Sequence, residues 1–224
     1  VLRSRKPLSD FEVVALTEVP VFTDKLIEPK EAYYYRVASV DAAGNESERT
    51  EPARLSLRER ELVELSGTIE RDTTLNAGLY LVKGVLVVAS GVTLTVSPDT
   101  RIYFEKHAAI KALASLNAQG EADLWIEFLP RTPEERYIGI SLEGGSPRLR
   151  YARIQGAQTA ISIKDSPLVV ANSVFEKNST AIHARGTPSP KITDSTIWHN
   201  IVGVRADDSR AIFSRNEITR NASG

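Results

Sequence analysis

Cysteine is absent from the 224 residues of the sequence. Its absence excludes disulfide bonds, thiolate metal sites and a cysteine nucleophile, and it is compatible with a reducing or an oxidising compartment. Methionine is absent as well. We therefore expect the chain to be a piece of a longer protein, so that the missing signal peptide carries no information about location.

Long hydrophobic runs and an excess of one charge are also missing. No apolar run approaches the roughly 20 residues that a membrane-spanning helix requires, so membrane insertion is not expected. The formal net charge is −1, which gives no electrostatic reason to expect nucleic acid as a partner. The hydrophobic fraction of 42% and the charged fraction of 25% are typical of a soluble globular protein.

Short stretches of alternating apolar and polar residues fill residues 1–57, as expected for β-strands. Two of these stretches are residues 11–16 and 21–24. A third stretch, residues 33–47, reads YYYRVASVDAAGNES. Gly44 within it supplies the positive φ that a tight turn requires. The pattern predicts a strand that leads into a hairpin.

The third stretch resembles the last two strands of a fibronectin type III domain, with tyrosines in the penultimate strand and Asp-Ala-Ala-Gly-Asn in the final hairpin. Residues 2–4 resemble the end of the third strand of that family. The resemblance implies an incomplete β-sandwich in residues 1–57, whose first two strands lie upstream or come from another chain. Because an open sandwich edge promotes aggregation, we expect a partner to cover it. The charged residues 58–66 could form a helical turn or a charged strand, and we expect a linker.

From residue 67 onward the sequence pattern changes to coils, which are longer and less regular at first and repeat with a period of 21–22 residues from Gly139 onward. A small residue followed by Ile or Val marks each repeat, and an Ile or Phe recurs at a second position. Repetition on two landmarks indicates a solenoid. The small residues are Gly139, Ala160, Ala181 and Gly203, and the second landmark is Ile154, Phe175, Ile197 and Ile218.

Asparagine follows the second landmark by three residues, at Asn178, Asn200 and Asn221. Leucine-rich repeats have a similar period, but these landmarks carry the β-branched and aromatic residues that strands prefer. The asparagine side chains can bond to one another from coil to coil, in an internal ladder that satisfies buried polar groups. We therefore predict an all-β fold with a right-handed parallel β-helix over residues 67–224.

The earlier coils carry a phrase of a known superfamily. Residues 91–100 read GVTLTVSPDT, and Ile102 and Phe104 follow. This resembles the Gly-Val-Thr-Leu-Thr-Ile-x-Pro-Gly-Thr phrase of bacterial surface and secreted proteins in the pectin-lyase-like β-helix superfamily, with Asp99 in place of the usual glycine. The resemblance implies the architecture and leaves the chemistry open, because the superfamily includes lyases, hydrolases, epimerases, adhesins and spacers.

Catalysis in the hydrolases and calcium-dependent lyases of this superfamily needs several carboxylates close together. The adjacent pair Asp207-Asp208 is one source, and the repeat aligns Asp207 with Asp165. With Arg205, these residues form a weak catalytic or calcium-binding alternative, although Gly186 interrupts the column and calcium requires about six to eight oxygen ligands. Polar turn residues are the other explanation. The three histidines have no metal-ligand spacing, so no metal site is predicted.

Aromatic residues that face solvent are candidates for stacking against sugar rings. Strand alternation turns Trp198 outward, because its neighbour Ile197 faces the interior. Tyr137, Tyr151 and Trp125 lie in earlier coils and are proposed as members of the same carbohydrate-binding surface. Trp198 can instead cover a neighbouring loop or pack against another coil, and the sequence leaves both roles open.

These observations favour a non-catalytic scaffold, adhesion or polysaccharide-binding module of a larger bacterial surface protein, located outside the cell. The expected partners are a polysaccharide or another surface protein, together with further coils or another chain that caps the solenoid. No cofactor is predicted, and calcium is the one candidate. Two alternatives stay open: a polysaccharide lyase or glycoside hydrolase, and a structural subunit of a surface assembly.

Overall fold

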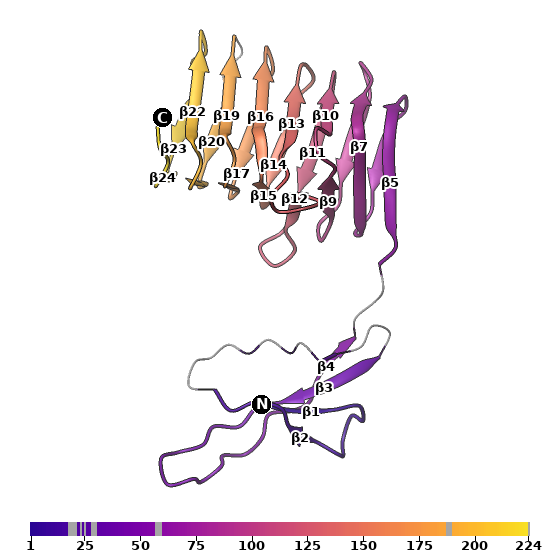
Figure 1. Cartoon of the computed structure of the whole chain (residues 1–224), viewed down its shortest axis with the longest axis vertical. Coiled ribbons are helices and arrows are strands. Elements are labelled where there is room, and N and C mark those ends of the chain that lie inside the picture. The colour runs from indigo at the N-terminus through magenta and orange to yellow at the C-terminus, as the bar shows by residue number, and fades with distance from the viewer. Residues whose placement is uncertain are drawn as a thin grey trace. The chain divides into compact units, whose positions relative to one another are not determined.

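In a computed structural model, the chain forms two compact units, Val1–Arg60 and Glu61–Gly224. The structure describes residues 1–17, 22, 24, 26–27, 31–56, 60–186 and 190–223. Every regular secondary-structure element found in these residues is a β-strand (Figure 1), which confirms the predicted all-β class. Within the described part of the chain there is no helix that could cross a membrane.

The first unit holds one antiparallel sheet of four strands in the order β2-β1-β3-β4. The strands are β1 (Leu2–Ser4), β2 (Glu12–Val13), β3 (Ala32–Arg36) and β4 (Ala53–Ser56). Between β3 and β4 the chain turns at Asp41, whose carboxylate accepts backbone hydrogen bonds from Ala43 and Asn45. Gly44 has a φ of +88° in this turn, as the sequence predicts.

A second sheet, which a complete sandwich needs, is not found among the described residues. The predicted strand residues Val21 and Thr23 lie outside them. The sheet nevertheless buries a large side chain on each face, because Tyr33 is 2% exposed on one and Leu2 is 4% exposed on the other. For this unit the structure therefore establishes a small antiparallel sheet and no more.

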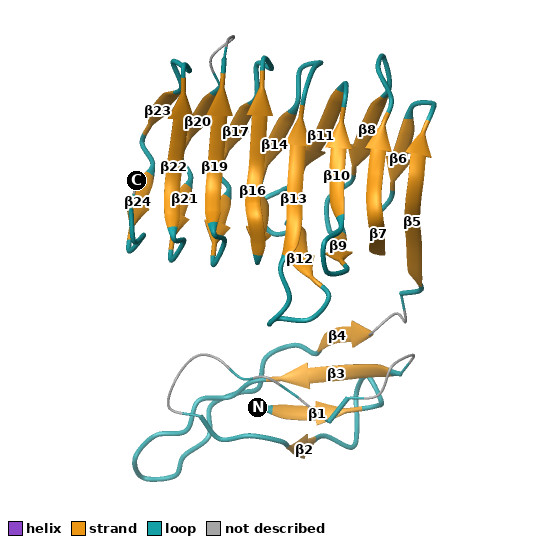
Figure 2. Cartoon of the chain, turned by 45° about the horizontal axis from the view of Figure 1, so that its top comes forward, coloured by secondary structure: helices purple, strands orange, loops and turns teal. Residues whose placement is uncertain are grey.

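The second unit is a right-handed parallel β-helix, as predicted, and the structure gives it three faces. Strands of successive coils pair in parallel along each face (Figure 2). Face 1 consists of β10 (Ala109–Ala112), β13 (Tyr137–Leu142), β16 (Ala157–Lys164), β19 (Thr180–Arg185) and β22 (Val202–Asp207). Face 2 consists of β9 (Arg101–Phe104), β12 (Ile126–Pro130), β15 (Ala152–Gln155), β18 (Val174–Glu176), β21 (Thr196–Trp198) and β24 (Glu217–Thr219).

Face 3 has one strand from each coil: β6 (Thr73–Leu75), β8 (Thr93–Val96), β11 (Ser115–Gln119), β14 (Arg148–Arg150), β17 (Val169–Ala171), β20 (Lys191–Thr193) and β23 (Ile212–Ser214). Two longer strands, β5 (Leu62–Ile69) and β7 (Leu79–Val88), turn the corner between faces 2 and 1. The first half of β7 pairs with β9 and its second half with β10. Inward side chains from all three faces form a single apolar core.

The small residue at the start of each repeat has a packing role. In β16 and β19, this residue and the isoleucine after it both point inward. All four are fully buried: Ala160, Ile161, Ala181 and Ile182. Two consecutive inward residues require a β-bulge, and the pairing of β13 with β16 shifts register at Gly139/Ile140. A Cβ atom on Gly139 would lie 1.7 Å from the carbonyl oxygen of Thr159, so a side chain does not fit there.

The solenoid begins before the predicted residue 67, because β5 starts at Leu62. Leu62 and Leu65 pair with Leu79 and Val82 of β7, so most of the predicted linker 58–66 is strand. Among the described residues β5 pairs only with β7, so its other side is a sheet edge, and Leu62 is 42% exposed. Charged and exposed side chains are common on edge strands, which explains why the charged sequence here resembles a linker.

An asparagine column runs through the interior between faces 2 and 1. The side-chain nitrogens of Asn178 and Asn200 each donate to the side-chain oxygen of the next asparagine, Asn200 and Asn221, at 3.0 Å. All three side-chain nitrogens also donate to the carbonyl of the second landmark in the preceding coil, at 2.9–3.1 Å. Asn178 is 1% exposed and Asn200 is 4% exposed, so the column satisfies polar atoms that water does not reach.

A second polar column, which the sequence analysis did not anticipate, lies between faces 3 and 2. It consists of Ser173, Ser195 and Asn216. Their side-chain oxygens accept backbone N–H groups of the preceding coil, from Ala152, Ser173 and Ser195, at 3.0–3.2 Å. Side-chain oxygens thus serve as acceptors at the corner where the strand ladder is interrupted.

Asn200→Ala should lower the free energy of unfolding of the solenoid by about 3 kcal/mol, because it leaves buried donors and acceptors in two coils without partners. Urea unfolding followed by tryptophan fluorescence measures this loss. Both tryptophans, Trp125 and Trp198, lie in the second unit, so the signal reports on that unit.

Asn117→Ala is the matched control for this substitution. Asn117 lies on β11, and its Oδ1 has no hydrogen-bond partner within the described ranges. Its removal should change the free energy of unfolding by less than about 0.5 kcal/mol. Equal losses in the two variants would contradict the stabilising role of the ladder.

Candidate functional site

Trp125 and Tyr151 lie side by side on the outer surface of face 2. Trp125 immediately precedes β12 and Tyr151 immediately precedes β15, and the pairing of Ile126 with Ala152 brings the two rings together. Their centroids are 5.8 Å apart at an interplanar angle of 70°, which is an edge-to-face contact. Two of the four aromatic residues proposed from the sequence are therefore neighbours.

A pocket of about 270 Å³ adjoins Trp125, and most of its wall is polar. The lining residues are Asp99, Arg101, Asp123, Leu124, Trp125, Glu127 and Arg153. They come from three successive coils, those of β9, β12 and β15. An aromatic ring combined with several directed polar groups is the usual composition of a ligand site.

A chain of ion pairs runs along this pocket from coil to coil. One oxygen of Glu127 lies 2.6 Å from Arg101 Nε, and the other lies 3.6 Å from Arg153 Nη1. Arg153 Nε is in turn 3.6 Å from a carboxylate oxygen of Glu176 on β18. The hydrogen bond that Arg101 donates to Glu127 raises the pKa of Arg101, although burial opposes it. The two arginines and two glutamates thus neutralise one another.

The ring of Trp125 is held in place by its neighbours. Its Nε1–H donates to the carbonyl of Ala122 at 2.9 Å, and the guanidinium carbon of Arg153 lies 5.9 Å from its centroid. Tyr151, which meets its edge, has a φ of 45°. This left-handed conformation costs a non-glycine residue about 1–3 kcal/mol, which the surrounding structure must offset. The aromatic pair is therefore positioned before any ligand arrives.

Tyr137 is not part of this surface, which corrects the expectation from the sequence. Its side chain is fully buried, and its ring stacks on Phe104 with centroids 4.1 Å apart. Burial raises the pKa of its phenol. The hydroxyl donates to the carbonyl of Phe128 at 3.3 Å, so this polar group can be buried without losing its hydrogen bond.

Trp198 lies further along face 2, at the end of β21. It is partly buried and stacks on His199, with centroids 4.5 Å apart and an interplanar angle of 14°. Its Nε1 is buried and has no acceptor among the residues that the structure describes. Trp198 therefore shares a face with Trp125 but not its pocket.

The charged residues that line the pocket were not predicted from the sequence. They are Arg101, Glu127 and Arg153. These residues pair laterally across β9, β12 and β15. Arg101 and Glu127 are 26 residues apart, as the bond between them records, whereas the later coils repeat every 21–22 residues. A search for a longer period in the earlier coils, with opposite charges at matching positions, would have found them.

The structure does not gather the residues of the catalytic alternative into one cluster. Asp207 lies 2.8 Å from His183 Nε2 and 3.2 Å from Arg205 Nε, and these two contacts lower the pKa of its carboxyl. Asp165 and Asp208 occupy the corner after face 1, each with a φ of 51°. Such left-handed corners favour Asp and Asn for conformational reasons alone.

Gly186 separates Asp165 from Asp208 in this corner. Backbone hydrogen bonds from Asp165 to Arg185 and from Gly186 to Asp207 place the three positions in successive coils. Two strand spacings, about 10 Å, therefore lie between Asp165 and Asp208. Across the described ranges, no group of three His, Cys, Asp or Glu side chains could hold a metal ion.

Comparison with known proteins bears on the second unit. A family model described as a right handed beta helix region matches residues 134–224. This range contains the strands from β13 to β24, the coils in which the 21–22-residue repeat is regular. No curated protein and no solved structure matches the chain. The comparison supports the fold and names no ligand or reaction.

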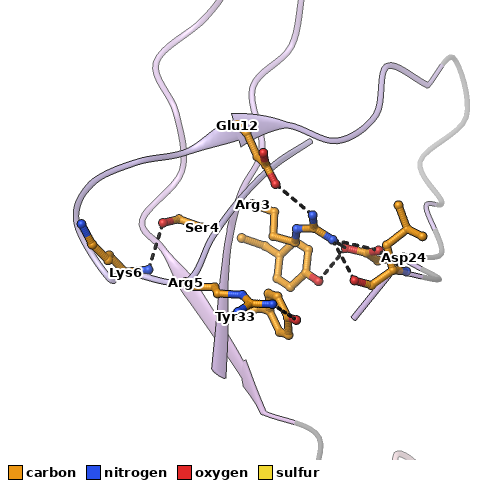
Figure 3. Close-up of polar contacts among 9 residues, drawn as sticks. Arg3, Ser4, Arg5, Lys6, Glu12, Asp24 and Tyr33 are labelled. Carbon is orange, nitrogen blue, oxygen red and sulfur yellow. Dashed lines mark hydrogen bonds and ion pairs between the residues drawn. The ribbon is translucent and has the colours of Figure 1, made fainter. Parts of the chain in front are cut away.

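The first unit contains a polar cluster on one face of its sheet (Figure 3). Arg3 forms ion pairs with Glu12 at 2.9 Å and with Asp24 at 3.0 Å. The hydroxyl of Tyr35 donates to Asp24 at 2.9 Å. A pocket of about 260 Å³ adjoins the cluster. Because these charged groups already satisfy one another, we assign the cluster a structural role.

Burial and the hydrogen bond to Asp24 raise the pKa of Tyr35 to about 12. The unfolded chain ionises this phenol near pH ~10. The contribution of Tyr35 to the stability of the first unit is therefore complete below about pH 10 and should be lost as the pH rises towards 12.

Titration of tyrosine absorbance tests this expectation. A phenol that ionises near pH 12 should be missing from Tyr35→Phe. Asp24→Asn should shift that ionisation only part of the way down, because burial is the larger cause. Tyr137 also has a raised pKa, and it is present in both variants. A Tyr35→Phe curve identical to that of the unaltered chain would refute the assignment.

Proposed function

We propose that the chain is a non-catalytic polysaccharide-binding module, and that the pocket beside Trp125 holds a sugar. The observation that carries this proposal is an aromatic ring, fixed by its own hydrogen bond, at the wall of a pocket lined by polar side chains. A sugar ring has an apolar face and a rim of hydroxyl groups. It therefore suits a site that offers a ring for stacking and several hydrogen-bonding groups around it.

A second candidate function has one observation in its favour. Asp99, Asp123 and Glu127 line the same pocket, and paired carboxylates are what glycoside hydrolases use. However, both oxygens of Glu127 face guanidinium groups, so this carboxylate is engaged in ion pairs and not directed at a ligand. We therefore favour binding over turnover, and the same experiment separates the two.

The proposal extends to the setting of the module. We assign it to the outside of a bacterial cell, as part of a larger surface protein in which a fibronectin type III domain precedes the solenoid. The sheet order β2-β1-β3-β4 and the hairpin at Gly44 are compatible with one sheet of such a domain. Leu16 is 83% exposed and Leu26 is 79% exposed, which suits surfaces that other strands or another chain cover.

Trp125→Ala should lower the affinity for polysaccharide by at least about tenfold, or ~1.4 kcal/mol, because it removes the stacking surface. Trp125→Phe retains a ring and should keep most of the affinity. A glycan array identifies the ligands, and isothermal titration calorimetry on the full chain then compares the variants.

Val85→Ala is the matched control, since Val85 is an apolar side chain, 48% exposed, in the half of β7 that pairs with β10 of face 1. This variant should bind polysaccharide with the same affinity as the unaltered chain. A reducing-sugar assay with neutral and uronic-acid polymers runs beside the binding measurements. Turnover of any polymer would establish the enzymatic alternative, and binding to none would reject the proposal.

A further inference from the structure

We infer that the binding site continues beyond the pocket, diagonally across face 2 from Trp125 to Trp198, and that its ligand is an uncharged linear glycan. This inference rests on the proposed function. It adds a second aromatic subsite, a minimum length for the ligand and the sign of its charge.

Continuous contacts join the two tryptophans. The guanidinium of Arg153 lies over the Trp125 ring at 5.9 Å, and its Nε lies 3.6 Å from Glu176. Glu176 is in turn the lateral partner of Trp198 in the pairing of β18 with β21. Each of these steps stays on the outer surface of face 2. The four side chains therefore form one diagonal strip, with an aromatic ring at each end.

Strand register gives the length of this strip. The column that contains Trp125 and Tyr151 continues through β18 to Asp194, just before β21. From Trp125 to Asp194 the column crosses three strand spacings, from the coil of β12 to that of β21. Trp198 lies four residues after Asp194 in the same coil. These steps correspond to about 20 Å. A ligand that contacts both rings must be an oligosaccharide that crosses several coils.

Two hydrogen-bond donors without acceptors lie on the strip. They are Trp198 Nε1 and Arg153 Nε, both buried nitrogen atoms without a hydrogen bond among the described residues, and Arg153 Nε has only its ion pair with Glu176 at 3.6 Å. A buried donor in this state costs about 1–3 kcal/mol, and native structures contain few of them. Hydroxyl and ring oxygens of a glycan are acceptors of the kind that these two donors lack.

The charges along the strip balance. Arg101 and Arg153 are paired with Glu127 and Glu176. Asp123 adds a further carboxylate to the pocket lining. An acidic polysaccharide would meet these carboxylates while both arginines of the pocket are already paired, and like charges at an interface oppose binding. A neutral glycan avoids that cost.

Binding of oligosaccharide series to the full chain tests the inference. The neutral series are gluco-, xylo- and manno-oligosaccharides, and the acidic series is oligogalacturonides, each from disaccharide to hexasaccharide. We expect affinity to rise with length in a neutral series. Trp198→Ala should lower the affinity for the hexasaccharide about tenfold and leave that for the disaccharide unchanged, because only the longer ligand reaches the second ring.

Three further variants are compared with Trp198→Ala. Trp198→Phe keeps a ring but removes the N–H donor, so its affinity should lie between those of the unaltered chain and Trp198→Ala. Ile212→Ala truncates an apolar side chain, 54% exposed, on face 3 of a nearby coil and should bind normally. Trp125→Ala should weaken every length. Circular dichroism and urea unfolding confirm that each variant is folded.

The possible results separate this inference from the proposed function. If Trp198→Ala lowers the affinity for short and long ligands equally, or for none, the second subsite is wrong while the sugar site at Trp125 stands. Tighter binding of oligogalacturonides than of every neutral series would overturn the assigned charge. If no glycan binds, the inference and the proposed function both fail.

Discussion

Parallel pairing between successive coils is the interaction on which the rest of the structure depends. Each strand of the three faces bonds only to strands of the coils before and after it, so every coil must present its residues in the same register. A slip of one residue would turn the inward side chains of that strand outward. The same requirement governs the corners, where the strand ladder stops. There Asn178 and Ser173 supply side-chain oxygens as acceptors for backbone N–H groups of the preceding coil.

This constraint explains which parts of the fold can be predicted from the sequence. The later coils repeat their landmarks because residues such as Ala160 and Ile161 must both fit inward at a bulge that recurs from coil to coil. The first coil follows a weaker rule. Leu62 lies on an edge strand with one paired side, so its surroundings place few demands on its sequence, and the boundary at residue 62 was not visible. The first unit is harder still, since its resemblance to a known domain depends on a single hairpin and on residues 2–4.

The candidate site, like the fold, was predictable from the sequence only in part. Trp125 and Tyr151 were proposed as aromatic residues of the earlier coils that share one surface, and the structure brings their rings into contact. The same proposal was wrong for Tyr137, whose hydroxyl donates to the Phe128 carbonyl, so that its side chain can be buried. The ion pairs of Glu127 were out of reach for a different reason. They join coils whose longer period separates Arg101 from Glu127 by 26 residues, so a repeat of 21–22 residues does not align them.

The asparagine ladder has a direction, and this direction affects how the solenoid can change in length. Asn178 bonds on one side to backbone groups alone, the Ala157 N–H and the Ile154 carbonyl, and on the other side to Asn200. A whole coil inserted between two ladder members would meet the same partners on both sides, whereas a partial coil would meet none. Distances along the solenoid axis therefore change in whole steps of about 4.8 Å. Duplication or loss of one repeat would therefore change the separation between surface features by the height of one coil and leave the interior unaltered.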